Sequence, residues 1–237
     1  MGNAMNMQAE ATDSGMAHAT AFADLDFDLL RRYVRVSRHK LTADQYLYHA
    51  GQPFQALYFV HSGCLKTVEL ADDGRDQVIG FRMRGELLGI ESIGLRQHVC
   101  SVVALEQGEV WELPYPAMLA ACREMPELQA KLTAALAEQI RQDHTWMLNV
   151  GTLNAEQRVA SFLVDVATRY ARLGYSARHF ILRMRRADMA NFLALKHETV
   201  SRAMTRLDDL QLIAVERREV RVLDDAGLRR MAAGCAG

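Results

Sequence analysis

The 237-residue sequence is poor in cysteine and proline, with four of each, and no apolar run is long enough to span a bilayer. None of the cysteines, Cys64, Cys100, Cys122 and Cys235, belongs to a CxxC pair, and the histidines are too scattered to complete a zinc-ligand set. We therefore expect reduced, buried thiols and no metal site. Residues 1–21 lack the basic start and apolar stretch of a signal peptide, so we expect a disordered leader and a cytoplasmic protein that contacts no membrane.

The sequence also lacks the motifs of common enzyme classes, because it contains no GxSxG, HExxH or Walker A pattern. We therefore expect no enzymatic activity. The net charge is only −1, but it is unevenly distributed. Residues 175–237 hold 12 basic and 8 acidic side chains, and the remainder holds 16 and 21. A basic C-terminal module on an acidic body suggests that only the C-terminal end meets a polyanion.

Residues 38–114 alternate short apolar runs, such as ALYFV at 56–60 and CLKTVEL at 64–70, with turn residues. The turns are Gly51-Gln52-Pro53, His61-Ser62-Gly63, Asp72-Asp73-Gly74 and Arg84-Gly85-Glu86. Strands at this close, regular spacing favour a small β-barrel or sandwich. A short amphipathic helix is expected ahead of it, at 25–33.

A long helix is predicted from Met125 onward, because Pro126 suits a first helical turn and Glu127 suits its positive end. Its seam recurs every three or four residues and comprises Leu132, Leu136, Ile140, Asp143, Met147 and Val150. This stripe could pack on the chain's own barrel. A coiled coil with a second subunit is at least as good an interpretation, so we assign residues 125–150 to a dimerisation helix in a homodimer.

The break Gly151-Thr152-Leu153 is expected to end this helix and to mark a domain boundary. Asn154 and Gln157 then form a capping-box pattern that begins a new helix. Gly174 suits the position just after its end. The C-terminal domain is accordingly assigned to residues 151–237.

Two short helices with a tight turn between them follow, at 186–193 and 197–207. Val200, Met204 and Leu207 lie on the inner face of the second helix, whereas its outer face is polar. Arginine can pair bidentately with guanine and glutamate can accept from cytosine, so such a face can read bases in the major groove. An ordinary solvated helix with mixed charges would show the same spacing.

A predicted β-hairpin wing decides between these two interpretations. Residues 212–215 and 219–222 flank the basic tip Glu216-Arg217-Arg218. Helix, turn, helix and basic wing together favour a winged helix-turn-helix that binds double-stranded DNA. The predicted DNA-binding residues are His197, Glu198, Thr199, Ser201, Arg202, Thr205, Arg217 and Arg218.

The sequence resembles the CRP/FNR family of bacterial regulators, and most closely its FNR-like branch. The resemblance runs from about Leu25 to the end and includes LYFVHSGCLKTV at 57–68, QVIGFRMRGELLGIESIG at 77–94, NAEQRVASFL at 154–163 and LALKHETVSRAMTRL at 193–207. It implies an α+β fold, with an N-terminal antiparallel β-roll sensor at 22–124, a long dimerisation helix and a C-terminal winged helix-turn-helix.

The resemblance also implies roles for residues of the second short helix. Glu198 and Arg202 match residues that read a G·C pair in each half-site, and Ser201 matches a serine that helps read the outer T·A side. Such proteins bind a TTGAT-type inverted repeat. His197 departs from the family, because the cAMP-receptor branch has arginine there and the FNR branch usually has an apolar residue.

Other departures concern the effector. Residues 1–60 contain no cysteine, and Trp111 occupies the barrel position of a cluster cysteine, so we expect no iron–sulfur cluster. Ile90 follows Gly89 where the cAMP-binding pattern has glutamate, and His98-Val99 replaces its Arg-Ser pair. Without that arginine a buried phosphate would lack its charge partner, so we expect no cAMP.

What the barrel senses stays open, since an unidentified small molecule, a thiol response and no effector are all compatible with the sequence. Haem or metal ligation is also conceivable, but lone residues of these types more often serve packing, so no cofactor is predicted. The side chains concerned are His49, His61, His98, Cys64 and Cys100. One competing interpretation is a ligand-binding signalling module whose C-terminal domain mediates only protein contacts.

Two further expectations concern partners. The turn containing Gly85 and Glu86 resembles a loop that FNR-like activators use to touch RNA polymerase, and it could equally be only a hairpin turn. Asp143 interrupts an otherwise apolar seam. If two copies of it meet across a dimer, their like charges oppose association. Alternatively, Asp143 points to solvent and the seam turns away from a partner.

Overall fold

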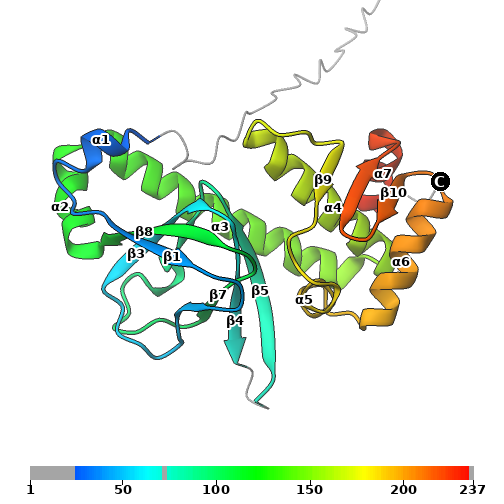
Figure 1. Cartoon of the computed structure of the whole chain (residues 1–237), viewed down its shortest axis with the longest axis horizontal. Coiled ribbons are helices and arrows are strands. Elements are labelled where there is room, and N and C mark those ends of the chain that lie inside the picture. The colour runs from blue at the N-terminus through cyan, green and yellow to red at the C-terminus, as the bar shows by residue number, and fades with distance from the viewer. Residues whose placement is uncertain (1–24, 71–73, 235–237) are drawn as a thin grey trace, which may run out of the picture.

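Two four-stranded antiparallel sheets form the N-terminal domain of the computed structural model, which describes residues 25–70 and 74–234 (Figure 1). The first sheet has the order β1-β8-β3-β6, with β1 at Ser37–Leu41, β8 at Gly108–Pro114, β3 at Ala56–Ser62 and β6 at Leu87–Leu88. The second has the order β2-β7-β4-β5, with β2 at Tyr46–Tyr48, β7 at Ser101–Ala104, β4 at Cys64–Leu70 and β5 at Asp76–Met83. This arrangement confirms the predicted antiparallel roll and the mixed fold class.

Alternation along the strands places the core of the roll between its two sheets. Val60 and Val110 from the first sheet meet Leu65 and Val102 from the second, and all four are buried. The predicted leader, and Asp72-Asp73 of one predicted turn, lie outside the described residues.

The helices flanking the roll differ in part from the prediction. Helix α1, Phe27–Leu30, is shorter than expected and begins where the Asp26 carboxylate accepts from the backbone N–H groups of Asp28 and Leu29. Helix α2, Tyr115–Glu124, was not predicted. No helix in the described ranges is long and apolar enough to cross a membrane.

Helix α3, Pro126–Thr152, begins at the predicted proline but continues through the predicted break. Gly151 and Thr152 stay helical, and the Thr152 hydroxyl donates to the Leu148 carbonyl at 2.8 Å. The expected end at Val150 was therefore wrong by two residues, because one helical glycine costs only about 1 kcal/mol. Helix α4, Ala155–Arg172, begins at Asn154 with the predicted capping box.

The C-terminal domain contains the predicted pair of helices, α5 at Arg186–Phe192 and α6 at His197–Asp209. The predicted wing is formed by β10, Ile213–Glu216, and β11, Glu219–Val222. Two elements were missed, namely β9 at His179–Ile181, which pairs with β11, and α7 at Asp225–Ala232.

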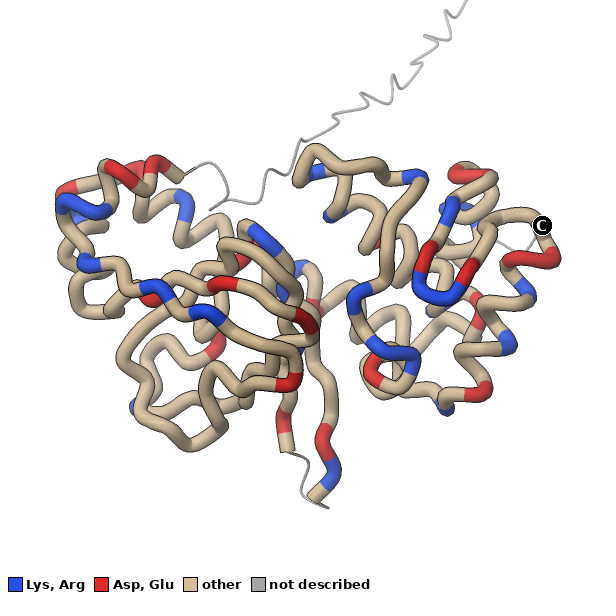
Figure 2. The backbone as a smooth tube through the Cα atoms, in the orientation of Figure 1, with Lys and Arg blue, Asp and Glu red and all other residues tan. Residues whose placement is uncertain are grey.

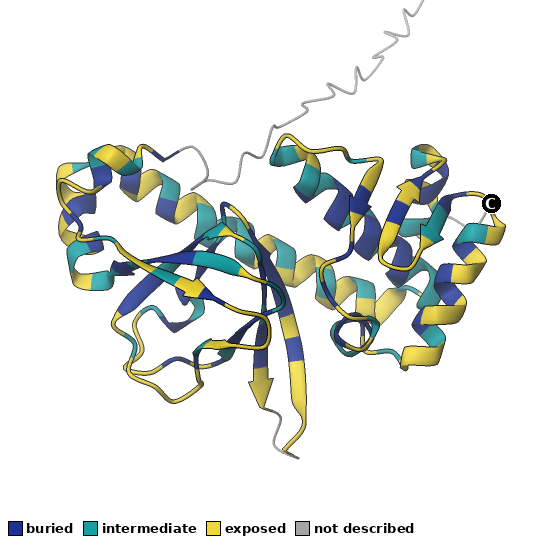
Figure 3. Ribbon diagram, viewed as in Figure 1, coloured by how far each residue is buried: buried dark blue, intermediate teal, exposed yellow. Residues whose placement is uncertain are grey.

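The two domains lie side by side, and α3 extends from one to the other (Figure 1). They share one apolar core, in which Val68 and Phe81 of the roll belong to the same buried cluster as Phe162 of α4 and Met189 of α5. Figure 3 shows buried segments both on β4 and β5 and within the C-terminal domain.

Polar contacts reinforce this contact between domains. The Lys66 ammonium lies 2.5 Å from the Asp188 carboxylate of α5. The Asn191 side chain accepts from the Val78 N–H at 2.6 Å and donates to the Asp76 carbonyl at 2.8 Å. It therefore satisfies one backbone donor and one backbone acceptor of β5. The first helix of the helix-turn-helix is thereby fixed to the roll.

Candidate DNA-binding interface

Helix α6 has one face packed into the domain. Val200 and Leu207 are fully buried, and Met204 is 4% exposed. The turn that leads into α6 is tight, since Ala194 adopts a positive φ of 53° and Leu195 donates to the Ala190 carbonyl. Packing therefore fixes the rotation of α6 about its axis and determines which side chains face outward.

The outward face carries the predicted base-reading residues, as Figure 3 shows by the exposed stripe along α6. His197, Glu198, Ser201, Arg202 and Thr205 are exposed, whereas Thr199 is half-buried. The hydroxyls of Ser201 and Thr205 each donate to the backbone carbonyl one turn earlier. Ser201 donates to His197 at 3.1 Å, and Thr205 donates to Ser201 at 3.2 Å. These oxygens remain able to accept further hydrogen bonds.

Glu198 and Arg202 lie one turn apart on this face, and neither has an ion-pair partner among residues 25–70 and 74–234. Both side chains are therefore available to an outside partner. Sequence reasoning missed Arg206, which is exposed one further turn along α6. Its spacing of four from Arg202 was sufficient to find it. A shallow hollow there is lined by Glu156, Ser201, Arg202, Thr205, Arg206 and Asp209.

The wing tip is basic as predicted, with Arg217 and Arg218 exposed (Figure 2). Arg217 has a positive φ of 54°, which closes the two-residue turn between β10 and β11. The Arg186 guanidinium of α5 lies 3.5 Å from the Arg217 carbonyl, so the tip stays close to the helix pair. Glu216 and Glu219 flank the tip and reduce its positive potential.

Comparison with known proteins identifies both domains. Residues 38–125 match the family model of the cyclic nucleotide-binding domain, and residues 157–231 match that of the Crp-like helix-turn-helix domain. The chain is 36% identical over 209 residues to the transcriptional activator protein Anr of Pseudomonas protegens, covering 88% of this chain and 85% of that protein. It is 37% identical over 204 residues to the transcriptional regulatory protein btr of Bordetella pertussis, covering 86% and 82%.

The chain belongs to the CRP/FNR family of transcription regulators. The solved structure of FixK2 from Bradyrhizobium japonicum is similar to it, with a TM-score of 0.76 at 26% identity, covering 85% of this chain and 99% of that chain. The relatives are regulators and not enzymes, which confirms that expectation, and the helix-turn-helix is a DNA-binding domain.

Aromatic rings surround His98 in the roll. His98, predicted to replace the phosphate-binding arginine, is 3% exposed and stacks on Tyr48, with ring centroids 3.8 Å apart and planes 16° apart. Phe54 meets His98 edge-on at 5.4 Å. Burial lowers the pKa of His98 and the Glu91 carboxylate opposes this only in part, so the imidazole is neutral near pH 7. A neutral ring offers a phosphate no counter-charge.

The described cysteines are buried, and burial disfavours their thiolate form. Cys64, Cys100 and Cys122 are buried and unpaired. Burial raises the pKa of Cys64 to about 12 and also raises that of Cys100. The thiolate is the reactive form, so these residues favour a structural role over a redox response.

In the turn predicted to touch RNA polymerase, the acidic side chain is engaged within the chain. Gly85 is buried and Glu86 is half-buried. The Glu86 carboxylate accepts two hydrogen bonds from Arg169 of α4 and one from the Met83 N–H. This carboxylate therefore serves the contact between the domains, and Arg84 is the exposed side chain of the turn.

The predicted seam on α3 divides into two parts. Leu132 is 8% exposed and Leu136 half-buried, and both pack against the roll of the same chain. Farther along, the seam is uncovered, with Ile140 54%, Met147 72% and Val150 38% exposed. Asp143 is exposed there too and accepts a hydrogen bond from Gln139 at 2.7 Å. The N-terminal part thus packs on its own roll, which was the alternative interpretation of the stripe.

Proposed function

We propose that this regulator is a homodimer that places α6 of each subunit in successive major grooves of an FNR-type inverted repeat. The observation that carries the proposal is the outer face of α6, where Glu198, Ser201 and Arg202 are exposed on a helix anchored by buried Val200 and Leu207. Arg202 would read guanine, Glu198 would accept from cytosine, and Ser201 would contact the neighbouring base pair. His197, Thr199, Thr205, Arg217 and Arg218 would support them.

The exposed part of α3 supports the homodimer. Ile140, Met147 and Val150 form an apolar stripe that water covers in a single chain, and a second α3 would bury it. A dimer also presents two copies of α6, which suits an inverted repeat.

The effector proposal is that neither cAMP nor an iron–sulfur cluster controls this protein. The neutral, stacked His98 argues against a bound cyclic phosphate, and the residue at the barrel cluster position is Trp111. RNA polymerase remains a proposed partner, through a surface other than the Glu86 carboxylate.

Fluorescence anisotropy with a labelled TTGAT-type palindrome tests the DNA-binding proposal. Binding of the full chain should be specific over a scrambled duplex, and it should weaken steeply between 0.05 and 0.3 M salt, because phosphate contacts release counterions. The same titrations with added cAMP, and under anaerobic conditions, should give unchanged affinities.

A signalling module whose C-terminal domain contacts only proteins would show neither specific binding nor a salt slope. Equal affinity for palindrome and scrambled DNA would overturn the site assignment while leaving DNA binding itself intact. An anaerobic or cAMP-dependent rise in affinity would overturn the effector proposal.

A further inference from the structure

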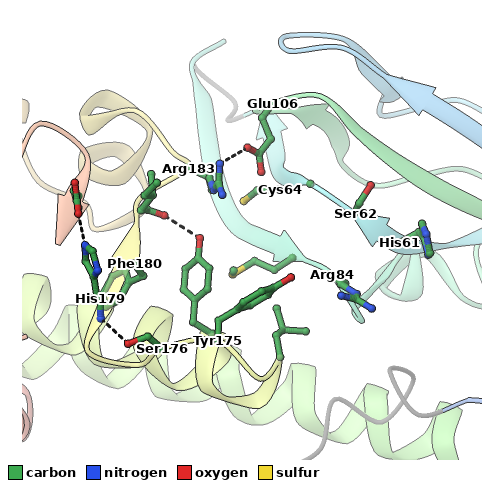
Figure 4. Close-up of a pocket in the computed structure, with 16 residues that line it drawn as sticks. His61, Ser62, Cys64, Arg84, Glu106, Tyr175, Ser176, His179, Phe180 and Arg183 are labelled. Atoms are coloured by element: carbon green, nitrogen blue, oxygen red, sulfur yellow. Dashed lines mark hydrogen bonds and ion pairs between the residues drawn. The ribbon is translucent and has the colours of Figure 1, made fainter. Parts of the chain in front are cut away.

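A cavity of about 690 Å³ lies between the roll and the C-terminal domain (Figure 4). The roll contributes the turn between β3 and β4, the turn after β5, and Glu106. The C-terminal domain contributes the end of α4, the chain leading to β9, and β9 itself. Its volume lies within the range of small-molecule pockets, which is roughly 300–1,000 Å³.

The middle of this interdomain cavity is apolar and aromatic. Tyr170 stacks on Phe180 with ring centroids 5.5 Å apart, and Tyr175 meets Tyr170 at 6.1 Å. Met83 and Leu173 complete this part of the lining. The aromatic or aliphatic part of a small molecule could pack here against several of these side chains at once.

Most polar groups of the lining already have partners. Arg183 is paired with Glu106 across the two domains at 2.9 Å, and His179 is paired with Glu219. The Tyr170 hydroxyl donates to the Ile181 carbonyl at 2.9 Å.

Arg84 is a charged group of the lining without such a partner in the described part of the chain. It is exposed at the opposite end of the cavity from His179, and no acidic group among the described residues pairs with it (Figure 4). The lining therefore combines an apolar middle with one uncompensated guanidinium. A guanidinium matches the two oxygens of a carboxylate in geometry and charge.

We infer that this interdomain cavity binds a small organic carboxylate with an aromatic or aliphatic body, and that Arg84 holds its carboxylate. The body would lie over Tyr170 and Tyr175, so the ligand would contact both domains. It would therefore stabilise their docked arrangement by a free energy that rises with the ligand concentration relative to its dissociation constant. The site lies outside the roll interior, where His98 stacks on Tyr48. It does not depend on which DNA sequence α6 reads.

Isothermal titration calorimetry of the full chain without DNA tests this inference. The probes are 3-phenylpropionate and decanoate, with 3-phenylpropionamide as the uncharged analogue of the first. The carboxylates should bind, and the amide should bind at least tenfold more weakly. Saturating 3-phenylpropionate should also raise the melting temperature of the chain.

Variants locate the binding site. Arg84→Gln should weaken 3-phenylpropionate binding at least tenfold, whereas Arg32→Gln, which removes an exposed arginine away from the cavity, should change nothing. Arg84→Glu should reverse the preference and favour 3-phenylpropylamine over 3-phenylpropionate. Tyr175→Ala should weaken binding of the amide and of the carboxylate alike, because it removes one aromatic ring from the cavity lining.

Two outcomes would overturn the inference. One is that neither carboxylate binds the wild type at millimolar concentration. The other is that Arg84→Gln, with unchanged circular dichroism, binds 3-phenylpropionate as tightly as the wild type does. Neither outcome bears on DNA recognition, which is measured separately.

Discussion

Arg169 of α4 donates two hydrogen bonds to the Glu86 carboxylate of the roll, from Nε to Oε1 at 3.0 Å and from Nη2 to Oε2 at 2.7 Å. Its side chain is 8% exposed, and it also donates to the Phe81 carbonyl. Burial alone would lower the pKa of Arg169, but Glu86 and Asp165 raise it above its usual value, so the guanidinium stays charged. The ion pair therefore connects the domains at a buried position.

Removing this guanidinium should destabilise the whole chain. Arg169→Met leaves Glu86 charged and without its main partner, and such losses cost about 3–5 kcal/mol in the free energy of unfolding. Urea denaturation measures this cost. Arg172→Met is the matched control, because Arg172 forms a looser pair with Glu138 at 3.5 Å and should change stability by under about 1 kcal/mol. Equal effects of the two substitutions would contradict a special role for Arg169.

Base reading by α6 can be separated from phosphate binding. Arg202→Ala should cost about 1–3 kcal/mol of specific binding and flatten the preference at the G·C pair. Arg218→Ala should weaken all sequences alike and reduce the salt slope by about 1. Anisotropy titrations on a set of single-base operator variants distinguish the two patterns. If Arg202→Ala retains the preference, α6 does not read that base pair.

In the proposed dimer, the exposed seam of α3 would bring two Asp143 carboxylates together as a repulsive pair. Asp143→Ala should tighten self-association, because it removes two like charges next to the apolar Ile140 and Met147. Sedimentation over a concentration series at neutral pH measures the dissociation constant. Asp143→Asn removes the charge and keeps the shape, so it should tighten the dimer as well. A weaker dimer in both variants would mean that Asp143 makes a favourable contact.

His98 predicts a pH-dependent stability. Its pKa is lowered in the folded state, whereas an unfolded histidine titrates near about 6.5. As the pH falls, His98 is therefore protonated in the unfolded chain before it is protonated in the folded chain. The contribution of the neutral ring to the free energy of unfolding is complete above about pH 7 and is lost progressively below about 6.5.

Urea unfolding at pH 7.5 and pH 5.5 measures that loss. His98→Phe keeps a ring for Tyr48 and cannot be protonated, so the difference between the two pH values should shrink. An identical difference in the wild type and the variant would show that other groups cause it.

Local patterns predicted α4, α5, α6 and the wing of the C-terminal domain, because the apolar positions of a helix recur every three or four residues. The spacing of Val200, Met204 and Leu207 predicted which face of α6 is buried. The pair Asn154 and Gln157 predicted where α4 begins. The roll was predicted from alternating runs and turns. Helix α7 was missed, although Asp224 accepts from the Gly227 N–H as an N-cap.

Contacts between the domains could not be predicted in this way. Lys66 and Asp188 are 122 residues apart in the sequence, and Arg169 and Glu86 are 83 apart. No periodicity connects such pairs, because they are brought together by the tertiary packing of the two domains. Nothing in the sequence therefore indicated that Glu86 pairs with Arg169, and the interdomain cavity had no sequence signature.

The core shared by the two domains should make them unfold as a single cooperative unit. A fragment beginning at Asn154 would expose the apolar surface of Phe162 and Met189 that Phe81 and Val68 cover in the whole chain. We therefore expect one thermal transition, and expect poor solubility of either half expressed alone. A chimaera that exchanges the roll for that of a relative would therefore have to exchange the facing side chains of α4 and α5 with it.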